Sequence, residues 1–347
     1  MRIIKSAILS FGMSGKVFHA PFLDLHPGFE FVGAWERSKS ELKGYYPNAK
    51  RFNTLKELLE DNSVELVVVN TPTYTHYEYA KLALEANKHV VVEKAFTTTV
   101  EEAETLDKLA RSRDLKLSVY QNRRWDSDFK TVQKVYESGV LGNPIDVSFS
   151  YERFAPNLSP KQHKEVPGPG AGIVKDLGPH VIDQALHLFG FPSAVFAHLA
   201  ITRPLSEVDD YFKILLFYPS FNVQLSGGYF FKIPSPSFII HGTNGSFLKS
   251  RADVQEQQLL KGMKPNAEGY GVELEGEFGV LQSDEGGSET KKLEALAGDY
   301  MKYYDGVYQA IANNKEAPVT AEDGIRVMKI IEAVFKSDLE KSVVALK

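Results

Sequence analysis

The sequence contains no cysteine among its 347 residues. This absence excludes disulfide bonds, thiolate nucleophiles and metal sites that depend on cysteine ligands. The sequence also has no apolar run that approaches the ~20 residues of a membrane-spanning helix, and no N-terminal apolar segment typical of secretion signals. We therefore expect no membrane partner, and we expect the protein to reside in the cytoplasm.

Strong charge of either sign is lacking as well. The formal net charge is −5, and no basic block or stripe interrupts the chain, which argues against nucleic acid as a partner. Hydrophobic residues make up 43% and charged residues 24% of the sequence, as in ordinary globular proteins. A chain of this length is expected to form two domains.

Short apolar runs alternate with helical patterns over the first third of the chain. These runs occupy residues 3–10, 29–35, 64–70, 89–94 and 115–120. Strands that alternate with helices on this spacing predict βαβ units, a parallel sheet and right-handed crossovers. The sequence therefore predicts a doubly wound α/β domain over residues 1–122.

The pattern changes after residue 122. Extended runs follow one another between residues 195 and 241 without helices between them, which predicts an α+β domain with a large mixed or antiparallel sheet over residues 123–347. Helices are expected at 127–137, 173–189, 293–312 and 321–339, and loops at 155–170 and 262–290. A sheet covered by helices on one face leaves the other face for a second subunit, so we expect a homodimer or homotetramer formed through this sheet.

The first predicted strand leads into a glycine turn of the kind that binds dinucleotides. The usual pattern is G-x-G-x-x-G, and here Ser10 takes the first position while Gly12 and Gly15 take the other two. Gly12 lets the backbone approach a pyrophosphate, and Gly15 allows the helix to pack closely on the strand. The strand–turn–helix context makes this a Rossmann-type fingerprint.

The end of the second predicted strand bears on the choice of cofactor. Glu36 lies 21 residues after Gly15, where an acid commonly binds the ribose diol of NAD. Arg37, Ser38 and Lys39 follow directly and could instead hold the 2′-phosphate of NADP. Both cofactors remain open, as does a simple solvated loop. If Glu36 holds the ribose, Glu36→Ala is expected to weaken NAD more than NADP.

A run of three valines ends abruptly in Glu93 and Lys94. Ligands of open parallel sheets bind beyond the carboxyl ends of the strands, so Lys94 is placed to contact a substrate. The alternative is a charged strand end that only meets water.

A second group of polar residues follows Gly172 at helical spacing. Asp176, His180, Asp183 and His187 lie at i, i+4, i+7 and i+11, on one side of a predicted helix. One interpretation is a metal site, although a single helix would then supply all its ligands. A structural role suits Asp183 and His187. The third interpretation is catalytic, with Asp176 orienting the His180 imidazole as a base that acts with Lys94.

Five segments together resemble a known protein family. They are residues 12–22 (Gly-Met-Ser-Gly-Lys-Val-Phe-His-Ala-Pro-Phe), 70–72 (Asn-Thr-Pro), 93–94 (Glu-Lys), 121–126 (Gln-Asn-Arg-Arg-Trp-Asp) and 176–180 (Asp-Leu-Gly-Pro-His). Their combination resembles the glucose–fructose oxidoreductase/inositol dehydrogenase (Gfo/Idh/MocA) family, in particular its scyllo-inositol dehydrogenase-like branch. The resemblance covers nearly the full length. Two departures are Ser10 in place of a glycine and Ala95 in place of a proline that commonly follows a cis peptide bond.

This resemblance implies an NAD- or NADP-dependent dehydrogenase that acts on a CH–OH group of a cyclic polyol or sugar. The implied catalytic residues are Lys94, Asp176 and His180. His180 would accept the hydroxyl proton, Asp176 would orient its ring, and Lys94 would stabilise negative charge on the reacting oxygen. The implied cofactor-binding residues are Phe11, Gly12, Met13, Ser14, Gly15, Glu36, Arg37, Thr71, Pro72, His76, Glu93, Lys94 and Asn122. Arg124, Tyr151 and Asp183 would bind substrate hydroxyls, although Tyr151 also fits a sheet-face aromatic.

Two other functions remain in view. Some members of the family have lost catalysis and become cofactor-bound sensors or transcriptional regulators. The presence of Lys94, Asp176 and His180 together favours an enzyme. A substrate that is not a carbohydrate also remains possible, because substrate choice depends on loop geometry.

Overall fold

The computed structural model describes residues 2–37, 40–284, 287 and 289–346. The chain forms two compact units. Unit 1 comprises residues 1–122, 255–270 and 299–325, and unit 2 comprises residues 123–254, 271–298 and 326–347. Two segments from late in the sequence therefore pack with the N-terminal residues. None of the described helices combines the length and the apolar character that crossing a membrane would require.

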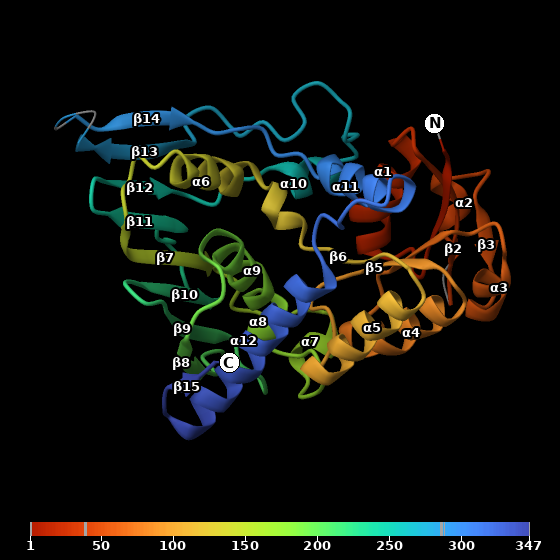
Figure 1. The fold of residues 1–347 in the computed structure, drawn as a ribbon, viewed down its shortest axis with the longest axis horizontal. Helices are drawn as coiled ribbons and strands as arrows, with labels where there is room; N and C mark the ends of the chain where they lie inside the picture. The colour runs from red at the N-terminus through yellow and green to blue at the C-terminus, as the bar shows by residue number, and fades with distance from the viewer. Residues whose placement is uncertain (1, 38–39, 285–286, 288, 347) are drawn as a thin grey trace. The chain divides into compact units, whose positions relative to one another are not determined.

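Unit 1 is built on a six-stranded parallel sheet (Figure 1). Its strands are β1 (Ile4–Ile8), β2 (Phe29–Trp35), β3 (Lys50–Phe52), β4 (Leu66–Val69), β5 (His89–Val92) and β6 (Leu117–Val119). The order β3-β2-β1-β4-β5-β6, with every neighbouring pair parallel, confirms the predicted doubly wound sheet. The order reverses between β1 and β4, so a ligand is expected outside the carboxyl ends of these strands.

The connections of unit 1 are mostly helical. The helices are η1 (Gly15–His19), α1 (Ala20–Leu25), α2 (Leu42–Tyr45), α3 (Leu55–Glu60), η2 (Thr73–Thr75), α4 (His76–Glu85), α5 (Val100–Ser112), α10 (Gln255–Leu260) and α11 (Met301–Ala312). All four residues of β4 are buried, as expected for a strand covered on both faces. The three valines of β5 are buried as well.

Unit 2 contains a nine-stranded mixed sheet. Its strands are β7 (Pro144–Glu152), β8 (Ala194–Ala200), β9 (Tyr211–Phe217), β10 (Asn222–Gly228), β11 (Phe238–Gly242), β12 (Gly245–Lys249), β13 (Phe278–Ser283), β14 (Lys291–Glu294) and β15 (Val344–Ala345). The order is β14-β13-β12-β11-β7-β10-β9-β8-β15. Only the β7–β10 pair among these is parallel. The predicted mixed sheet is confirmed.

The helices of unit 2 are α6 (Ser127–Glu137), α7 (Gln162–Glu165), α8 (Ile173–Asp176) and α9 (Gly178–Phe189). The C-terminal part of α12 (Ala321–Glu340) also belongs to it. A short 3-10 turn, η3 (Asn122–Trp125), spans the boundary between the units. In Figure 1, α9 lies beside the strands of the large sheet, and it contacts both β7 and β10.

The prediction of one helix over residues 173–189 is wrong. Helix α8 ends at Asp176, and α9 begins at Gly178. Pro179 has no N–H to donate to a carbonyl one turn earlier, and the His180 N–H bonds instead to the Leu177 carbonyl at 3.2 Å. Asp176 and His180 therefore lie in two successive helices, which meet at Leu177.

Three other predictions need correction. The loop expected over 262–290 contains β13, and the helix expected over 293–312 begins only at Met301, after β14. Helix α7 lies within the loop expected over 155–170. Both missed strands are stabilised by pairing along the edge of the sheet, where β12 pairs with β13 and β13 with β14. Such tertiary pairing overrides a local composition rich in glycine and charge.

Candidate functional site

The glycine turn after β1 forms a close-packed cradle. A Cβ on Gly15 would lie 2.2 Å from the Ser10 carbonyl oxygen, whereas a Cβ on Gly12 would meet only the Ser10 Oγ at 3.4 Å. Gly15 is thus needed for packing, and the Gly12 side of the turn stays open. The amides at the start of the following helix have no partner within that helix, which suits a pyrophosphate. The turn therefore fits a dinucleotide.

Ser10 is accommodated in place of the usual glycine by hydrogen bonds. The Ser10 N–H donates to Asn70 Oδ1 (3.0 Å), and the Asn70 Nδ2 donates back to the Ser10 carbonyl (2.7 Å). The Ser10 Oγ accepts the N–H of Gly12 at 3.3 Å. The backbone of Ser10 does not lie in the left-handed region. A side chain at this position therefore causes no backbone strain of the kind that favours glycine.

Phe11 and Met13, the other residues predicted in this turn, differ in exposure. The Phe11 ring is buried and meets the edges of Tyr45 and Tyr46 at centroid distances of 5.6 and 6.0 Å. Met13 is 42% exposed. Phe11 therefore anchors the turn, while Met13 remains accessible.

Glu93, at the end of β5, is held by a chain of buried hydrogen bonds. Its carboxylate accepts from Ser14 Oγ (2.6 Å), from His19 Nε2 (3.0 Å) and from the backbone N–H of Lys94 (3.2 Å). The other ring nitrogen of His19, Nδ1, lies 2.6 Å from the hydroxyl of Tyr304. The chain connects the glycine turn, through Ser14, to the strand end that carries Lys94.

Tyr304 closes this series of hydrogen bonds. Tyr304 is fully buried, and its hydroxyl lies beside His19 Nδ1. The His19 ring therefore links Tyr304 on one side to the Glu93 carboxylate on the other.

Burial raises the pKa of Glu93, but the hydrogen bonds from His19 and Ser14 and the nearby Lys94 charge outweigh it and bring the pKa to about 2. A lowered carboxyl pKa stabilises the folded state above the ordinary value of about 4.5, and this stabilisation disappears as the pH falls towards 2. We therefore expect Glu93→Gln to flatten the acid dependence of stability in this range. Urea unfolding at a series of pH values measures it, and parallel curves for variant and wild type would contradict it.

The residues that follow β4 are tied to the segment after Lys94. His76 is buried, and its two ring nitrogens each lie 2.8 Å from a carbonyl oxygen, of Ala95 and of Thr71. Burial lowers the pKa of His76. The Thr71 hydroxyl shares a hydrogen bond with Thr75 (2.7 Å). His76 thus positions backbone on two segments and presents no open ring nitrogen.

Three more predicted residues complete this part of unit 1. The Lys94–Ala95 peptide bond is cis. Pro72 precedes η2, and its carbonyl accepts from the backbone N–H and the hydroxyl of Thr75. Asn122 is 5% exposed, at the end of unit 1.

Glu36 is turned into the protein. The residue is 4% exposed, and its carboxylate accepts the N–H groups of Glu41 (2.9 Å) and Leu42 (3.3 Å). Arg51 approaches to 3.6 Å. Arg37 is exposed, whereas Ser38 and Lys39 lie outside the described residues. The carboxylate that was expected to meet the ribose is thus engaged with the start of α2.

In unit 2, Asp176 forms an ion pair that was not predicted. Its Oδ1 lies 2.6 Å from the Nζ of Lys164, which lies in α7. His180 is 4% exposed in the first turns of α9. The Lys164 partner had no local signal in the sequence, because twelve residues separate it from Asp176.

Arg124 and Asp183 bind each other. Two guanidinium nitrogens donate to the two carboxylate oxygens at 2.8 and 2.7 Å, and both side chains are buried. Such a two-pronged pair is strong and directional. The charges expected to receive substrate hydroxyls therefore form a structural clamp between η3 and α9.

Tyr151 lies among cations on β7. The guanidinium carbons of Arg251, Arg153 and Arg123 lie 4.3, 4.6 and 5.6 Å from its ring centroid. The Tyr151 hydroxyl accepts from Arg153 (2.8 Å), and its ring centroid is 6.2 Å from that of His180. Tyr151 is thus buried on the sheet face, as expected for a sheet-face aromatic, and its contact with substrate stays a prediction.

Comparison with known proteins gives consistent results over the whole chain. Residues 4–121 match the model "Oxidoreductase family, NAD-binding Rossmann fold", and residues 134–346 match "Oxidoreductase family, C-terminal alpha/beta domain", both of the Gfo/Idh/MocA family. The scyllo-inositol 2-dehydrogenase (NADP(+)) IolW of Bacillus subtilis (strain 168) is 38% identical, over 99% of this chain and 96% of that protein. The uncharacterized oxidoreductase YdgJ of Escherichia coli (strain K12) is 37% identical over 99% of each.

Solved structures agree in fold. The oxidoreductase yvaA of Bacillus subtilis superposes with a TM-score of 0.95 at 38% identity, over 99% of both chains. An oxidoreductase structure from Bacteroides fragilis reaches a TM-score of 0.90 at 41% identity, over 99% of this chain and 100% of that one. The resemblance carried by the five sequence segments is confirmed.

Proposed function

The chain belongs to the Gfo/Idh/MocA family of oxidoreductases, with an NAD-binding Rossmann domain, and from this membership we propose that it oxidises a secondary alcohol of a cyclic polyol or sugar. The observation that carries the proposal is the position of Lys94. Lys94 follows β5 at the carboxyl edge of the cofactor-binding sheet, and its backbone N–H donates to the Glu93 carboxylate. An inositol-like substrate is supported by the similarity to IolW.

The proposed reaction uses three residues of the chain. His180 accepts the hydroxyl proton of the substrate, and Asp176 assists by its negative charge. The Lys94 ammonium donates a hydrogen bond to the reacting oxygen and stabilises the charge that develops there. Bound nicotinamide cofactor supplies the hydride acceptor, or the donor in the reverse direction.

We propose that NADP is preferred over NAD. The Glu36 carboxylate is buried and already accepts two backbone N–H groups, so it is poorly placed to bind a ribose diol. Arg37 is exposed beside it and can pair with a 2′-phosphate. IolW, a relative at 38% identity, is an NADP(+) enzyme by its name.

Cofactor titrations of two variants separate these roles. Arg37→Ala is expected to weaken NADP about 10-fold, the loss of a charge-assisted contact, and to leave NAD unchanged. Glu36→Ala is expected to weaken both cofactors equally, because it removes a cap of α2 and no ribose contact. A selective loss of NAD in Glu36→Ala would restore Glu36 as the ribose ligand.

A substrate panel tests the function itself. Purified protein with NAD or NADP is expected to reduce the cofactor in the presence of scyllo-inositol, another cyclic polyol or a sugar, measured by absorbance of the reduced nicotinamide. Tight cofactor binding without turnover of any polyol, sugar or ketose would favour a regulator instead. Turnover of a non-carbohydrate alcohol alone would retain the enzyme and replace the substrate class.

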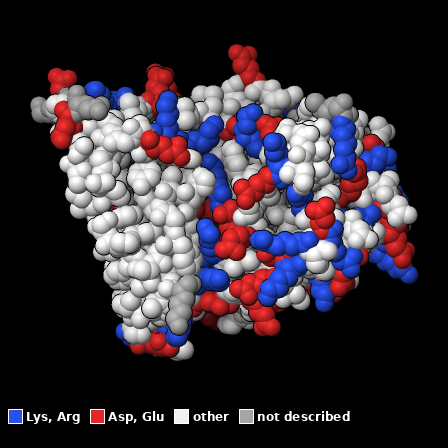
Figure 2. Space-filling model, in the orientation of Figure 1, with Lys and Arg blue, Asp and Glu red and all other residues white. Residues whose placement is uncertain are grey.

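We further propose that the large sheet forms a dimer or tetramer interface. Cross-strand pairing aligns a largely apolar row on the face away from α9: Phe196, Leu215, Gln224, Ser148, Ile239, Leu248 and Val280. Figure 2 shows few charged side chains over these strands. A face of this kind needs an apolar cover.

Charge on this row is expected to dissociate the oligomer. Leu215→Lys with Ile239→Lys should convert the wild-type assembly into monomers, because two ammonium groups would have to be buried. Sedimentation velocity measures the change, and Leu82→Lys, on the exposed surface of α4, is the control. An unchanged assembly in the double variant would reject the sheet as the interface.

The cytoplasmic location stays a prediction.

A further inference from the structure

The buried imidazole of His19 is connected to the strand end that carries Lys94. His19 lies in η1 and is fully buried, so its side chain has no surface to offer a substrate or a cofactor. Its Nε2 lies 3.0 Å from Glu93 Oε1, the oxygen that also accepts from the Ser14 hydroxyl. The other oxygen, Oε2, accepts the backbone N–H of Lys94 at 3.2 Å. One carboxylate thus joins His19 and Ser14 on one side to Lys94 on the other.

The His19 ring is itself held from two sides. The Tyr304 hydroxyl lies 2.6 Å from Nδ1, and the Tyr120 ring lies beside the imidazole at a centroid distance of 4.5 Å. Tyr304 is fixed in turn, because its ring stacks on Phe22 at 5.8 Å and α11, which carries it, packs against α1. A ring with contacts at both nitrogens has little freedom to rotate. The imidazole therefore keeps one orientation toward the Glu93 carboxylate.

The titratable groups around Glu93 come from five parts of unit 1. They are Lys94 directly after β5, His19 in η1, His76 in α4, Tyr120 directly after β6 and Tyr304 in α11. Burial is the largest influence on the pKa of Glu93 and raises it, but the groups that stabilise the anion outweigh burial and bring the pKa to about 2. His19 contributes most to this lowering of the pKa. Loss of His19 would therefore favour the protonated carboxyl.

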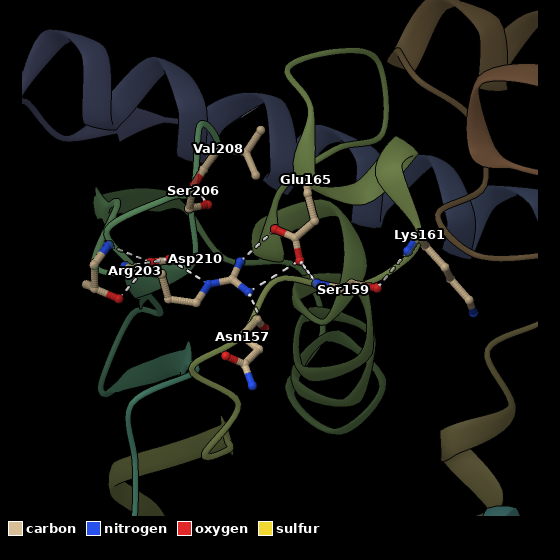
Figure 3. Close-up of polar contacts among 9 residues, drawn as sticks. Asn157, Ser159, Lys161, Glu165, Arg203, Ser206, Val208 and Asp210 are labelled. Atoms are coloured by element: carbon tan, nitrogen blue, oxygen red, sulfur yellow. Dashed lines mark hydrogen bonds and ion pairs between the residues drawn. The ribbon is translucent and has the colours of Figure 1, made fainter.

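A buried ionic cluster in unit 2 provides a structural comparison. Figure 3 shows the Arg203 guanidinium between the carboxylates of Glu165 and Asp210, to which it donates at 2.8 and 2.9 Å. Glu165 is the last residue of α7, and Asp210 directly precedes β9, so this cluster fixes a helix to the start of a strand. The hydrogen-bond series of Glu93 differs because it ends at the backbone of the proposed catalytic lysine.

We propose that His19 is a positioning residue of the dehydrogenase reaction, which holds the Glu93 carboxylate in the orientation that fixes the backbone of Lys94. Tyr304 supports this arrangement by fixing the His19 ring. Without His19 the carboxylate can turn or take up a proton, and the Lys94 ammonium then moves away from the reacting oxygen. A displacement of about 1 Å at a reacting group can lower a rate by ~10²-fold. The inference rests on the proposed function, since it assigns His19 to the step in which Lys94 acts.

Two substitutions of His19 separate positioning from packing. Leucine fills much of the buried space but has no donor for Glu93, whereas the glutamine amide can still donate an N–H to the carboxylate. His19→Leu is expected to lower kcat about 10–100-fold with little change in KM for the alcohol. His19→Gln should recover most of this loss. Steady-state kinetics under saturating cofactor, with the best alcohol of the panel, measure both variants.

The pH dependence of kcat is the readout that a purely structural role of His19 would not change. In His19→Leu the pKa of Glu93 should rise from about 2 towards or above its ordinary value of about 4.5. The variant should therefore show an additional loss of kcat as the pH falls through this raised pKa, where Glu93 of the wild type remains ionised. Adding Glu93→Gln should remove the additional loss, because an amide does not titrate. Asp210→Asn, in the cluster of Figure 3, is the control for a weakened buried ion pair and should add no such loss.

Tyr304→Phe tests the support of the imidazole without changing His19. It removes only the hydroxyl beside Nδ1 and keeps the ring that stacks on Phe22. We expect kcat to fall about 3–10-fold, the effect of one hydrogen bond, with a weaker form of the same loss at low pH. Tyr303→Phe is the matched control, because the Tyr303 hydroxyl is in the same helix and equally buried but donates to Ser118 Oγ at 2.9 Å.

Three results would overturn the inference. They are wild-type kcat in His19→Leu, a pH dependence of His19→Leu that matches the wild type, and equal effects of Tyr304→Phe and Tyr303→Phe. Urea unfolding verifies that each variant folds, and Tyr304→Phe decides if His19→Leu does not. A wild-type protein that turns over no alcohol of the panel removes the dehydrogenase proposal and this inference with it, whereas an active wild type with an unaffected His19→Leu removes the inference alone.

Discussion

Lys94→Met is expected to lower kcat by about 10²–10³-fold, the cost of removing one preorganised donor to a developing oxyanion. Methionine keeps the length and apolar stem of the side chain but has no N–H to offer. NADP affinity should change little, because Glu93 and the glycine turn keep their hydrogen bonds. The loss should therefore appear in the chemical step.

Steady-state kinetics with the best polyol of the panel, together with cofactor titration, measure this effect. Lys108→Met, on the exposed face of α5, is the control for loss of a lysine and should retain wild-type kcat. A Lys94→Met variant with near-normal kcat would remove Lys94 from the reaction. A variant that fails to bind NADP would show instead that Lys94 serves the cofactor site.

Breaking the Arg124–Asp183 pair is expected to destabilise the protein by about 3–5 kcal/mol, because Asp183→Ala leaves a buried guanidinium without its carboxylate. The pair is bidentate, and its side chains are only 8% and 3% exposed. Replacing both partners, as in Arg124→Met with Asp183→Leu, should recover much of the lost stability, since neither charge of the pair then remains buried without its partner.

Urea unfolding of the two variants measures the difference. Lys302→Ala, which breaks an exposed ion pair with Asp305, is the control and should cost less than about 1 kcal/mol. If Asp183→Ala unfolds at the wild-type urea concentration but loses polyol binding, Asp183 serves the substrate and the clamp is secondary.

The parallel sheet could be predicted because its signals are local. Each strand from β1 to β6 except β3 carries its own apolar run, and covered strands need no alternation. Strands β13 and β14 carry no such run. They form because β13 pairs with β12 and β14 pairs with β13. Pairing with a strand that is distant in sequence cannot be predicted from the local residue pattern.

The residues of the candidate site also differ in whether the local sequence predicts them. Gly12 and Gly15 could be predicted from the spacing of the glycine turn, and Lys94 could be proposed because it follows the carboxyl end of a strand. Tyr304 could not, since 285 residues separate it from His19. His19 itself belongs to one of the recognised segments, yet its role appears only once Glu93 and Tyr304 are seen on either side of its ring.

Helical spacing was the least reliable guide. The spacing of Asp176 and His180 suggested a single helix, but α8 ends at Asp176 and α9 begins at Gly178. The ion partner of Asp176 is Lys164, on another short helix. The joint role of Asp176 and His180 stays a prediction that rests on the family resemblance.

The central claim is that Lys94 and His180 act on one hydroxyl in one chemical step. The most direct measurement is kcat for Lys94→Met, His180→Asn and the double variant under saturating cofactor and polyol. The account predicts that the double variant is hardly slower than the slower single variant, because residues that act as a unit are strongly non-additive. If the two losses simply multiply, or if His180→Asn turns over at the wild-type rate, the proposed mechanism is contradicted.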